Sequence, residues 1–333
     1  MRRGRCIATP RPADTGCALT DIREVADPVE AAAVLRAGGL AIVPTETVYG
    51  LAADATNVEA VARIYAAKGR PDFNPLICHV ADRAMADRLG ELDVRARTLI
   101  EAFWPGPLTI VVPLKAETGI APAVTAGLFT VALRRPVGVM GKIAAALGRP
   151  IAAPSANLSG AVSATARVHL VPLLERLEPK RDVLVAGEAG GVGLESTIVA
   201  LDGAPRLLRA GGIPGSAIET VLGARLAEAG EGVRAPGMLA SHYAPNGSVR
   251  LNVRSVGPDE FLIAFGQKRA EGRPRGMFQL SEAGDLDEAA RNLFDALHAA
   301  NRVQALRIAV EPIPSQGIGE AINDRLRRAA APR

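Results

Sequence analysis

Polar residues with no evident structural duty gather at four places along this 333-residue chain. The first is "PTETVYG" (44–50), which sets three hydroxyls and one carboxylate between a proline and a glycine. An ordinary turn needs Pro and Gly, but not two threonines and a tyrosine. The other three are "KGRPDFNPLICHV" (68–80), "PSANLSGAVSAT" (154–165) and "GEAGGVGLEST" (187–197), the last followed by Arg209.

The residue types in these segments suit binding of anions. Lys68 and Arg70 are separated by one residue and offer a fork for a phosphate or carboxylate. A Ser/Asn-rich turn after a strand can present hydroxyls and backbone N–H groups to a second anion. The sequence has no H-E-x-x-H and no redox C-x-x-C motif. It therefore favours nucleotidyl or acyl transfer to or from a phosphate-bearing substrate, by positioning and charge neutralisation without an enzyme-bound nucleophile.

Each segment also has a purely structural interpretation. Gly69 could end a helix whose negative end Lys68 and Arg70 stabilise. The "PSANLSG" segment could be a turn, because Ser, Asn and Gly are turn residues. His79 alternates with apolar neighbours, as a core histidine in a strand would. "GGVG" matches neither the dinucleotide fingerprint nor the P-loop pattern.

Short apolar runs alternating with amphipathic helices are expected to position these segments. Asp27 and Pro28 predict a helix start, and Asn57 predicts the cap of a second helix over 58–69. We expect strands at "LAIVP" (40–44), "PLICHV" (75–80), "LTIVVPL" (108–114), "FTVALRRP" (129–136), "RPIAAPSAN" (149–157), "DVLVAG" (182–187), "STIVAL" (196–201) and "PRLLRAG" (205–211). The close spacing of the last three favours a partly antiparallel sheet covered by helices.

Composition divides the chain into four parts. Residues 1–20 form a basic tail, predicted to be disordered, with a transit peptide as the alternative. Residues 21–228 form the first domain. Residues 229–247, rich in Gly, Pro and Ala, form a linker. Residues 248–333 form a small βαβα domain with a parallel sheet, from strands at "FLIAFG" (261–266) and "ALRIAVEPIP" (305–314) and helices at 286–300 and 319–330.

Composition also limits the class of protein. Hydrophobic residues make up 48% and aromatic residues only 3%, so the cores must be aliphatic. No apolar run approaches the roughly 18–20 residues of a membrane span. The net charge is +4, but residues 21–247 are nearly balanced, which weakens a nucleic-acid interpretation. Cys6, Cys17 and Cys78 have no metal-type spacing, and their odd number favours a reducing compartment.

Five segments in order resemble the threonylcarbamoyl-AMP synthases, in the long form of the Sua5/YrdC/YwlC family that has a C-terminal Sua5 domain. They are "PTETVYGL", "KGRPDFNPLICHV", "APSANLSG", "GLESTIV" and "PGMLASHYAP", and the resemblance covers about residues 20–330. It implies an α/β fold: a twisted mixed sheet with helices and a deep concave cleft, plus a small Rossmann-like C-terminal domain.

The resemblance also implies a reaction. L-threonine, bicarbonate or CO2, and ATP would give threonylcarbamoyl-AMP and pyrophosphate, which makes the protein a cytoplasmic nucleotidyltransferase. A partner enzyme would pass the threonylcarbamoyl group to tRNA as the t6A37 modification, so contact with tRNA would be indirect. Mg2+ would arrive with ATP, without protein ligands of its own. The alternative is a tRNA- or double-stranded-RNA-binding module that uses the same cations.

Site residues follow from the same resemblance. The implied sets are Lys68, Arg70, Ser155 and Asn157 for catalysis; Thr47, His79, Arg134 and Ser196 for threonine; and Arg70, Asn74, Ser155, Ser163, Arg209 and Tyr243 for ATP. The segment with Tyr243 resembles a linker that folds over the cleft as a lid. Many members have Lys before "HYAP", where this chain has Ser241. Glu46 could cap its own loop or meet the substrate ammonium.

Overall fold

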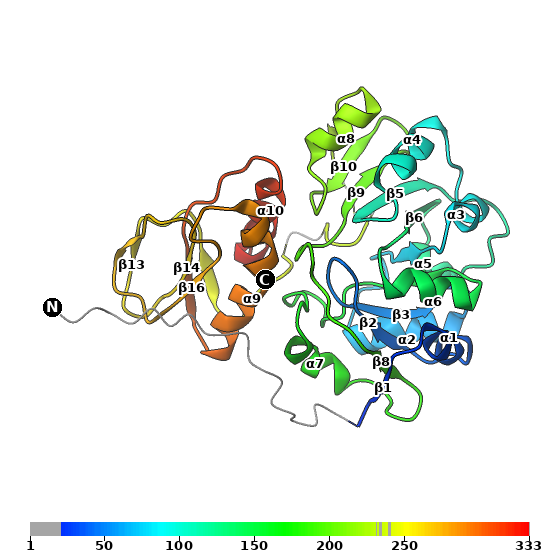
Figure 1. Ribbon diagram of the computed structural model, residues 1–333, viewed down its shortest axis with the longest axis horizontal. Coiled ribbons are helices and arrows are strands. Elements are labelled where there is room, and N and C mark those ends of the chain that lie inside the picture. Colours follow the sequence, from blue (N-terminus) through cyan, green and yellow to red (C-terminus); the bar gives the residue numbers. More distant parts are fainter. Residues whose placement is uncertain (1–20, 231, 233–234, 239–240, 333) are drawn as a thin grey trace.

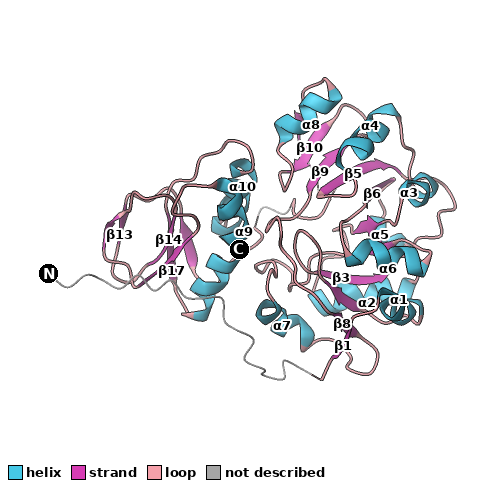
Figure 2. Cartoon of the chain, viewed as in Figure 1, coloured by secondary structure: helices cyan, strands magenta, loops and turns pink. Residues whose placement is uncertain are grey.

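The structure is a computed structural model that describes residues 21–230, 232, 235–238 and 241–332. The proposed tail, residues 1–20, lies outside the described residues. Two lobes are visible, a larger one formed by the first two thirds of the chain and a smaller C-terminal one (Figure 1). Helices lie around the outside of the larger lobe, and strands run through it (Figure 2).

An 11-stranded mixed sheet organises the larger lobe in the order β1-β8-β2-β3-β7-β4-β6-β5-β9-β10-β11. Its strands are β1 (Arg23–Val25), β2 (Ala41–Val43), β3 (Gly50–Asp54), β4 (Ile77–His79), β5 (Leu108–Pro113), β6 (Thr130–Arg134), β7 (Ile151–Ala152), β8 (Val183–Val185), β9 (Thr197–Ala200), β10 (Arg206–Arg209) and β11 (Ala227–Glu228).

Every strand expected in this region is present, and the sheet mixes parallel and antiparallel pairs as predicted. The expectation for a mixed α/β fold is therefore confirmed.

Helices cover both faces of this sheet. They are α1 (Pro28–Arg36), α2 (Val58–Lys68), α3 (Arg83–Leu89), α4 (Val94–Phe103), α5 (Pro122–Thr125), α6 (Val139–Leu147), a 3-10 turn at Arg167–Leu170, α7 (Val171–Leu174) and α8 (Gly215–Leu222). Along β2, Ile42 joins the core beneath α2, whereas Ala41 and Val43 join the core beneath α1 and α6. Successive strand residues point to opposite faces, so one short strand contributes to two cores.

Local sequence signals set the ends of the two N-terminal helices. Asp27 accepts a hydrogen bond from the amide of Val29, and Pro28 occupies the first helical position. Asn57 accepts from the amide of Ala60 and begins α2. Gly69 ends α2 in the left-handed conformation, at φ 60°, which favours glycine. The predicted helix start and stop signals are therefore confirmed.

The smaller lobe contains a four-stranded sheet of order β12-β17-β14-β16, with every neighbouring pair parallel. Its elements are β12 (Ser248–Arg250), β13 (Ser255–Val256), β14 (Phe261–Ala264), β15 (Glu271–Gly272), β16 (Gly276–Gln279), α9 (Leu286–Arg302), β17 (Arg307–Val310) and α10 (Gly319–Ala330). The parallel sheet and both helices match the expectation. β13 and β15 form a separate two-stranded parallel sheet.

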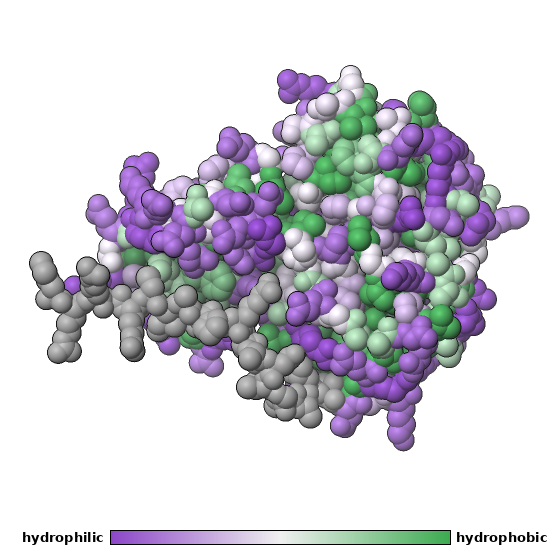
Figure 3. Space-filling view, in the orientation of Figure 1, coloured by the Kyte–Doolittle hydropathy of each residue, from purple (hydrophilic) through white to green (hydrophobic). Residues whose placement is uncertain are grey.

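Helices α9 and α10 lie on the side of the small sheet that faces the larger lobe (Figure 1). On the face drawn in Figure 3, hydrophilic side chains surround the outer rims of both lobes, and the surface becomes less polar where the lobes meet. Apolar residues of the larger lobe, including Val48, Val162 and Leu194, share a buried cluster with Leu293 and Leu297 of α9. The two lobes are therefore packed together through a common core.

Candidate active site

A pocket forms where several strand ends and the linker meet. Strands β4 and β6 run parallel, with His79 paired to Arg134, so both side chains emerge at one edge of the sheet. The loop between β2 and β3 and the turn after β7 close the same edge. The pocket is lined by Thr45, Thr47, Val48, Tyr49, Gly50, Arg70, Ile77, His79, Arg134, Met140, Ala153, Pro154, Ser155, Glu195, Ser196, Arg209, Pro236, Gly237, His242 and Tyr243.

Eight of the twelve predicted site residues belong to this lining. They are Thr47, Arg70, His79, Arg134, Ser155, Ser196, Arg209 and Tyr243. The remaining four are not in the lining. Lys68, Asn74 and Ser163 hydrogen-bond to lining residues. Asn157 holds the turn that follows β7. Direct contact of these four with substrate stays a prediction.

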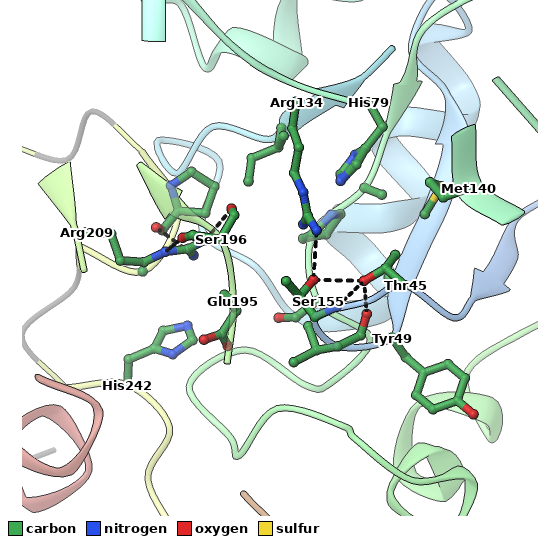
Figure 4. A pocket seen from close by; sticks show the side chains of 18 of the residues that line it. Thr45, Tyr49, His79, Arg134, Met140, Ser155, Glu195, Ser196, Arg209 and His242 are labelled. Carbon is green, nitrogen blue, oxygen red and sulfur yellow. Dashed lines mark hydrogen bonds between the residues drawn. The ribbon is translucent and has the colours of Figure 1, made fainter. Parts of the chain in front are cut away.

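The hydroxyls of the β2–β3 loop form one connected network. Thr45 Oγ1 lies 2.8 Å from Thr47 Oγ1 and donates to the carbonyl of Val48 at 2.6 Å. Tyr49 points away from the other side chains labelled in Figure 4, and its hydroxyl donates to the carbonyl of Gly187 at 2.8 Å. Burial raises the pKa of Tyr49 to about 12. Thr45 and Tyr49 therefore shape the loop, and Thr47 faces the pocket.

Arg134 is the central cation of this part of the pocket. Its guanidinium donates to Thr47 Oγ1 at 3.0 Å and lies 2.8 Å from a carboxylate oxygen of Glu46. Neither oxygen of Glu46 makes a hydrogen bond of good geometry among the described residues, so the contact is mainly electrostatic. The adjacent Arg135 donates instead to the carbonyl of Ala81, outside this pocket.

His79 stands beside Arg134 and is buried. Burial, with a smaller contribution from Arg134, lowers the pKa of His79 to about 3, so the imidazole is neutral at physiological pH. Its Nδ1 atom is buried and has no hydrogen-bond partner among the described residues. A buried polar atom without a partner is costly, so this nitrogen is a ready contact for a polar ligand.

Arg70 and Lys68 have different duties. Arg70 lines the pocket, and its guanidinium donates to the side-chain oxygen of Asn74 and to the carbonyl of Pro75, both at 2.7 Å. Burial lowers its pKa to about 10, so it keeps its charge at neutral pH. Lys68 is 3% exposed, and its ammonium donates to the carbonyls of Ser155 and Asn157. Lys68 therefore holds the turn after β7.

The turn after β7 is fixed from inside. The side-chain amide of Asn157 donates to the carbonyls of Leu158 and Ala161, both at 2.9 Å. The backbone of Ser155 pairs with Gly50 at the start of β3. This arrangement leaves the side chain of Ser155 at the pocket wall (Figure 4).

The far side of the pocket is built from β9, β10 and the linker. Ser196 Oγ lies 2.7 Å from Thr109 Oγ1 and accepts from the Arg209 guanidinium at 3.1 Å. Arg209 also donates to the carbonyl of Pro236 at 3.1 Å, which ties the linker to the sheet. Gly237 approaches so closely that a Cβ there would lie 2.8 Å from the hydroxyl of Tyr243.

Glu195 is a lining residue that the sequence analysis did not single out, although it stands inside the quoted "GLEST". Its carboxylate accepts from Ser163 Oγ at 2.5 Å and from Arg325 Nε at 2.9 Å. Burial alone would raise the pKa of Glu195, but the charges of Arg325 and Arg209 lower it to about 2. The sequence signal that could have indicated Glu195 as a site residue is its place between an apolar residue, Leu194, and the two hydroxyl residues that follow it.

The chemistry of the pocket is anion binding. Three buried or half-buried guanidiniums face it, from Arg70, Arg134 and Arg209, together with several hydroxyls. Among the described residues, no group of three His, Cys, Asp or Glu side chains could hold a metal ion. No helix within the described residues is long and apolar enough to cross a membrane.

Two family models together match most of the chain. The model described as "Telomere recombination", which spans the Sua5, YciO and YrdC proteins, matches residues 33–211. The model described as the C-terminal domain of threonylcarbamoyl-AMP synthase matches residues 213–331. The order of the two models agrees with the two lobes.

Curated relatives and a solved structure agree with these models. A threonylcarbamoyl-AMP synthase of Bacillus subtilis is 39% identical, over 95% of this chain and 96% of the relative. One of Pyrococcus abyssi is also 39% identical, over 90% of this chain and 93% of the relative. The crystal structure of P. abyssi Sua5 complexed with L-threonine matches with a TM-score of 0.82 and 35% identity, covering 93% of this chain and 98% of that one. The chain therefore belongs to the threonylcarbamoyl-AMP synthase family, in its two-domain form.

Proposed function

We propose that the protein is an L-threonylcarbamoyladenylate synthase, a nucleotidyltransferase that uses L-threonine, bicarbonate and ATP. The observation that carries this proposal is a pocket lined by three guanidiniums, from Arg70, Arg134 and Arg209. Arg134 donates to the hydroxyl of Thr47, and Arg209 donates to that of Ser196. The names of the relatives favour this function over the alternative of an RNA-binding module.

The threonine end is assigned to Arg134, Thr47, His79 and Ser196. The guanidinium of Arg134, which now contacts Glu46, would bind the threonine carboxylate. The neutral His79 would offer its unpartnered nitrogen to a polar group of the amino acid. The relative crystallised with L-threonine supports an amino-acid site in this fold.

The nucleotide end is assigned to Arg70, Ser155, Arg209 and Tyr243, supported from behind by Asn74 and Ser163. In the reaction, the amine of threonine and bicarbonate would first give the carbamate N-carboxy-threonine with loss of water. An oxygen of this carbamate would then attack the α-phosphorus of ATP. The bond from that phosphorus to the bridging oxygen breaks, and pyrophosphate leaves with the electron pair. Both reactants are anions, so the main duty of these cations is to screen repulsion and hold the two in line. Mg2+ would enter bound to the triphosphate and cover its charge.

Residues Lys68 and Asn157 complete the catalytic set through the turn that they hold. The ammonium of Lys68 fixes the carbonyls of Ser155 and Asn157, which leaves the side chain of Ser155 at the pocket wall. Burial, followed by the charge of Arg70, lowers the pKa of Lys68. A bound triphosphate would offset that effect and favour the charged ammonium.

The linker over 229–247 is proposed as a lid over a deep cleft. The free volume of the pocket is about 40 Å³, whereas ligand pockets are typically about 300–1,000 Å³. Described linker residues, among them Pro236 and Tyr243, form one wall. This small volume supports a movement of the wall when ATP enters, and its return would keep water from the labile mixed anhydride.

Four further assignments rest on the same family membership. The domain boundaries at 228 and 247 and a Rossmann-like C-terminal domain remain predictions. The product would pass to a transferase that modifies tRNA at A37, so tRNA would be an indirect partner. The proposed location is the cytoplasm, where ATP, bicarbonate and tRNA occur together.

The test is pyrophosphate release by the purified protein with ATP, Mg2+, bicarbonate and amino acids. We expect release that requires threonine, and we expect R70M to lower it by at least about 100-fold, because a buried charged contact to phosphate is lost. R36M, on the surface helix α1, is the matched control and should keep full activity. No release, together with tight salt-sensitive RNA binding, would favour the binding module. Release that does not depend on threonine would contradict the proposed substrate.

A further inference from the structure

The C-terminal lobe contacts the proposed nucleotide pocket at several of its motif segments. Glycine 193, in "GGVGLEST", has a φ of +80°, and a Cβ there would lie 2.3 Å from the Cα of Arg291 in α9. His298 Nε2 lies 3.0 Å from the carbonyl of Ser163, and Thr165 Oγ1 donates to Asp295 at 2.7 Å. Helix α9 is therefore packed directly against the loop that contains Glu195 and against the loop that contains Ser163.

Helix α10 sends one arginine into this interface. Arg325 is 0% exposed, although arginine is rarely fully buried unless its charge is paired. Its Nε donates to Glu195 at 2.9 Å, and its Nη1 donates to Asp324 at 2.7 Å. Its guanidinium carbon lies 4.9 Å from the centre of the Tyr243 ring, within cation–π range.

The remaining nitrogen of Arg325 is available for another contact. Nη2 is buried and has no hydrogen-bond partner among the described residues. Tyr243 is itself buried between Arg325 and Phe294, whose ring centre lies 5.6 Å from its own. The C-terminal lobe thus supplies two of the contacts of the Tyr243 ring, and His242 meets its ring edge-on at 4.1 Å.

The charge of Glu195 explains why this arginine matters. Its carboxylate lines a pocket that must accept a polyphosphate anion under the function proposed above. In a site of low dielectric, an uncompensated carboxylate would repel phosphate strongly. Two cations offset that charge, Arg209 from the larger lobe and Arg325 from the smaller one. Arg209 is also assigned to the nucleotide, so it cannot serve Glu195 alone.

We propose that Arg325 is a positioning residue through which the C-terminal domain completes the ATP pocket. Its guanidinium neutralises Glu195, holds that carboxylate away from the triphosphate, and supports the ring of Tyr243 at the pocket wall. This inference rests on the proposed function, because it needs a phosphate-bearing ligand in the pocket. The C-terminal domain is then part of the nucleotide site rather than a separate module.

The experiment compares the affinity of the full chain for Mg·ATP among four proteins by calorimetry. They are the wild type, R325M, R325M/E195Q and R327M. Arg327 is exposed on the same helix, so R327M is the matched control and should bind ATP as the wild type does. We expect R325M to raise the Kd for ATP on the order of tenfold or more. R325M/E195Q should recover most of that loss, because the repelling carboxylate is gone.

The rescue separates an electrostatic role from a merely structural one. If Arg325 served only for packing, E195Q would disturb the interface further, and the Kd of R325M/E195Q for ATP would stay high or rise. That result, or wild-type affinity in R325M, would overturn the inference. A wild-type protein that bound no ATP would overturn the proposed function as well, so the two failures are distinguishable.

A second variant covers the case in which R325M fails to fold. E195Q keeps an oxygen that can accept from Ser163 and leaves Arg325 in place, still paired with Asp324. We expect E195Q to fold and to bind ATP at least as tightly as the wild type. Weaker binding of ATP by folded E195Q would contradict the role assigned to the pair.

Discussion

Thr47 and Arg134 show at the scale of single residues how the pocket is prepared for an anion. The Thr47 hydroxyl accepts from the guanidinium at 3.0 Å and lies 2.8 Å from the hydroxyl of Thr45. Arg134 is 4% exposed, so few rotamers are open to it. A cation held in one orientation loses little conformational entropy when the substrate binds, which favours tight and selective recognition of a carboxylate.

We expect Thr47→Val to weaken threonine binding. Valine has nearly the same shape, but it removes the hydroxyl that orients Arg134 and any contact of that hydroxyl with substrate. A hydrogen bond to a charged group contributes about 1.5–3 kcal/mol, so the KM for threonine should rise roughly 10- to 100-fold. The KM for ATP should change much less. Steady-state pyrophosphate release at varied threonine measures both.

Thr220→Val supplies the matched control for this prediction. Thr220 is exposed on α8, and its hydroxyl only donates to the carbonyl of Ser216 in its own helix. This variant should keep wild-type kinetics. An unchanged KM for threonine in Thr47→Val would remove Thr47 from the threonine site.

Helices and strands differed in how well the sequence revealed them. Helix starts at Asp27 and Asn57 were predictable, because capping is a local interaction between residues two or three apart. Strand β3, Gly50–Asp54, was not identified, since Gly, Ala and Asp have weak strand preference. It is fully buried, and its place comes from pairing with β2 and β7.

Contacts across long stretches of chain decided which motif residues face the pocket. Lys68 donates to carbonyls 87 and 89 residues away, and Ser163 donates to Glu195, 32 residues away. Motif resemblance placed both residues at the site, but only the fold shows that they stand behind its lining. The pairing of Glu195 with Arg325 spans 130 residues and joins two lobes, so no local pattern could indicate it.

The linker is an element whose motion the proposed function requires. Tyr243 has a φ of +59°, a backbone conformation that is uncommon for a residue with a side chain. Its ring is 1% exposed and packs against Phe294 and beneath Arg325. A strained backbone held by packing is consistent with an element that moves between two positions.

We expect Tyr243→Ala to bind ATP more weakly and to release its adenylate product sooner. Loss of the ring opens the pocket wall, so water reaches the mixed anhydride. Rapid-quench measurement of threonylcarbamoyl-AMP, free and bound, gives the lifetime, and calorimetry gives the affinity. Tyr243→Phe keeps the ring and should behave nearly as the wild type does. If Tyr243→Ala kept both the ATP affinity and the product lifetime of the wild type, the proposal that the linker is a lid would be wrong.

At the scale of the whole molecule, a stacked histidine pair joins the lobes. The rings of His169 and His298 lie 3.6 Å apart and 10° from parallel. Burial, with the charges of His298 and Arg302, lowers the pKa of His169 to about 2. Burial lowers the pKa of His298 to about 4, although the nearby Asp295 raises it. Both rings are therefore neutral in the folded protein at neutral pH.

These lowered values predict loss of stability in mild acid. The unfolded chain takes up protons at its histidines as the pH falls through about 6.5, whereas the folded chain does not until far lower pH. Each histidine then lowers the free energy of unfolding by up to about 1.4 kcal/mol for every unit by which the pH falls. All four histidines of the chain have lowered pKa values, so the free energy of unfolding should fall steeply between about pH 6.5 and 5.

His298→Gln isolates the contribution of the lobe interface. The glutamine amide can still reach the carbonyl of Ser163 but does not titrate, so the slope of unfolding free energy against pH should decrease by about a quarter, one histidine in four. Urea unfolding at several pH values measures this slope. The difference in unfolding free energy between the variant and the wild type at pH 8 measures the effect of the lost stacking separately. An unchanged slope would mean that His298 is already protonated in the folded protein, and the stacked pair would then be a cationic contact that Asp295 stabilises.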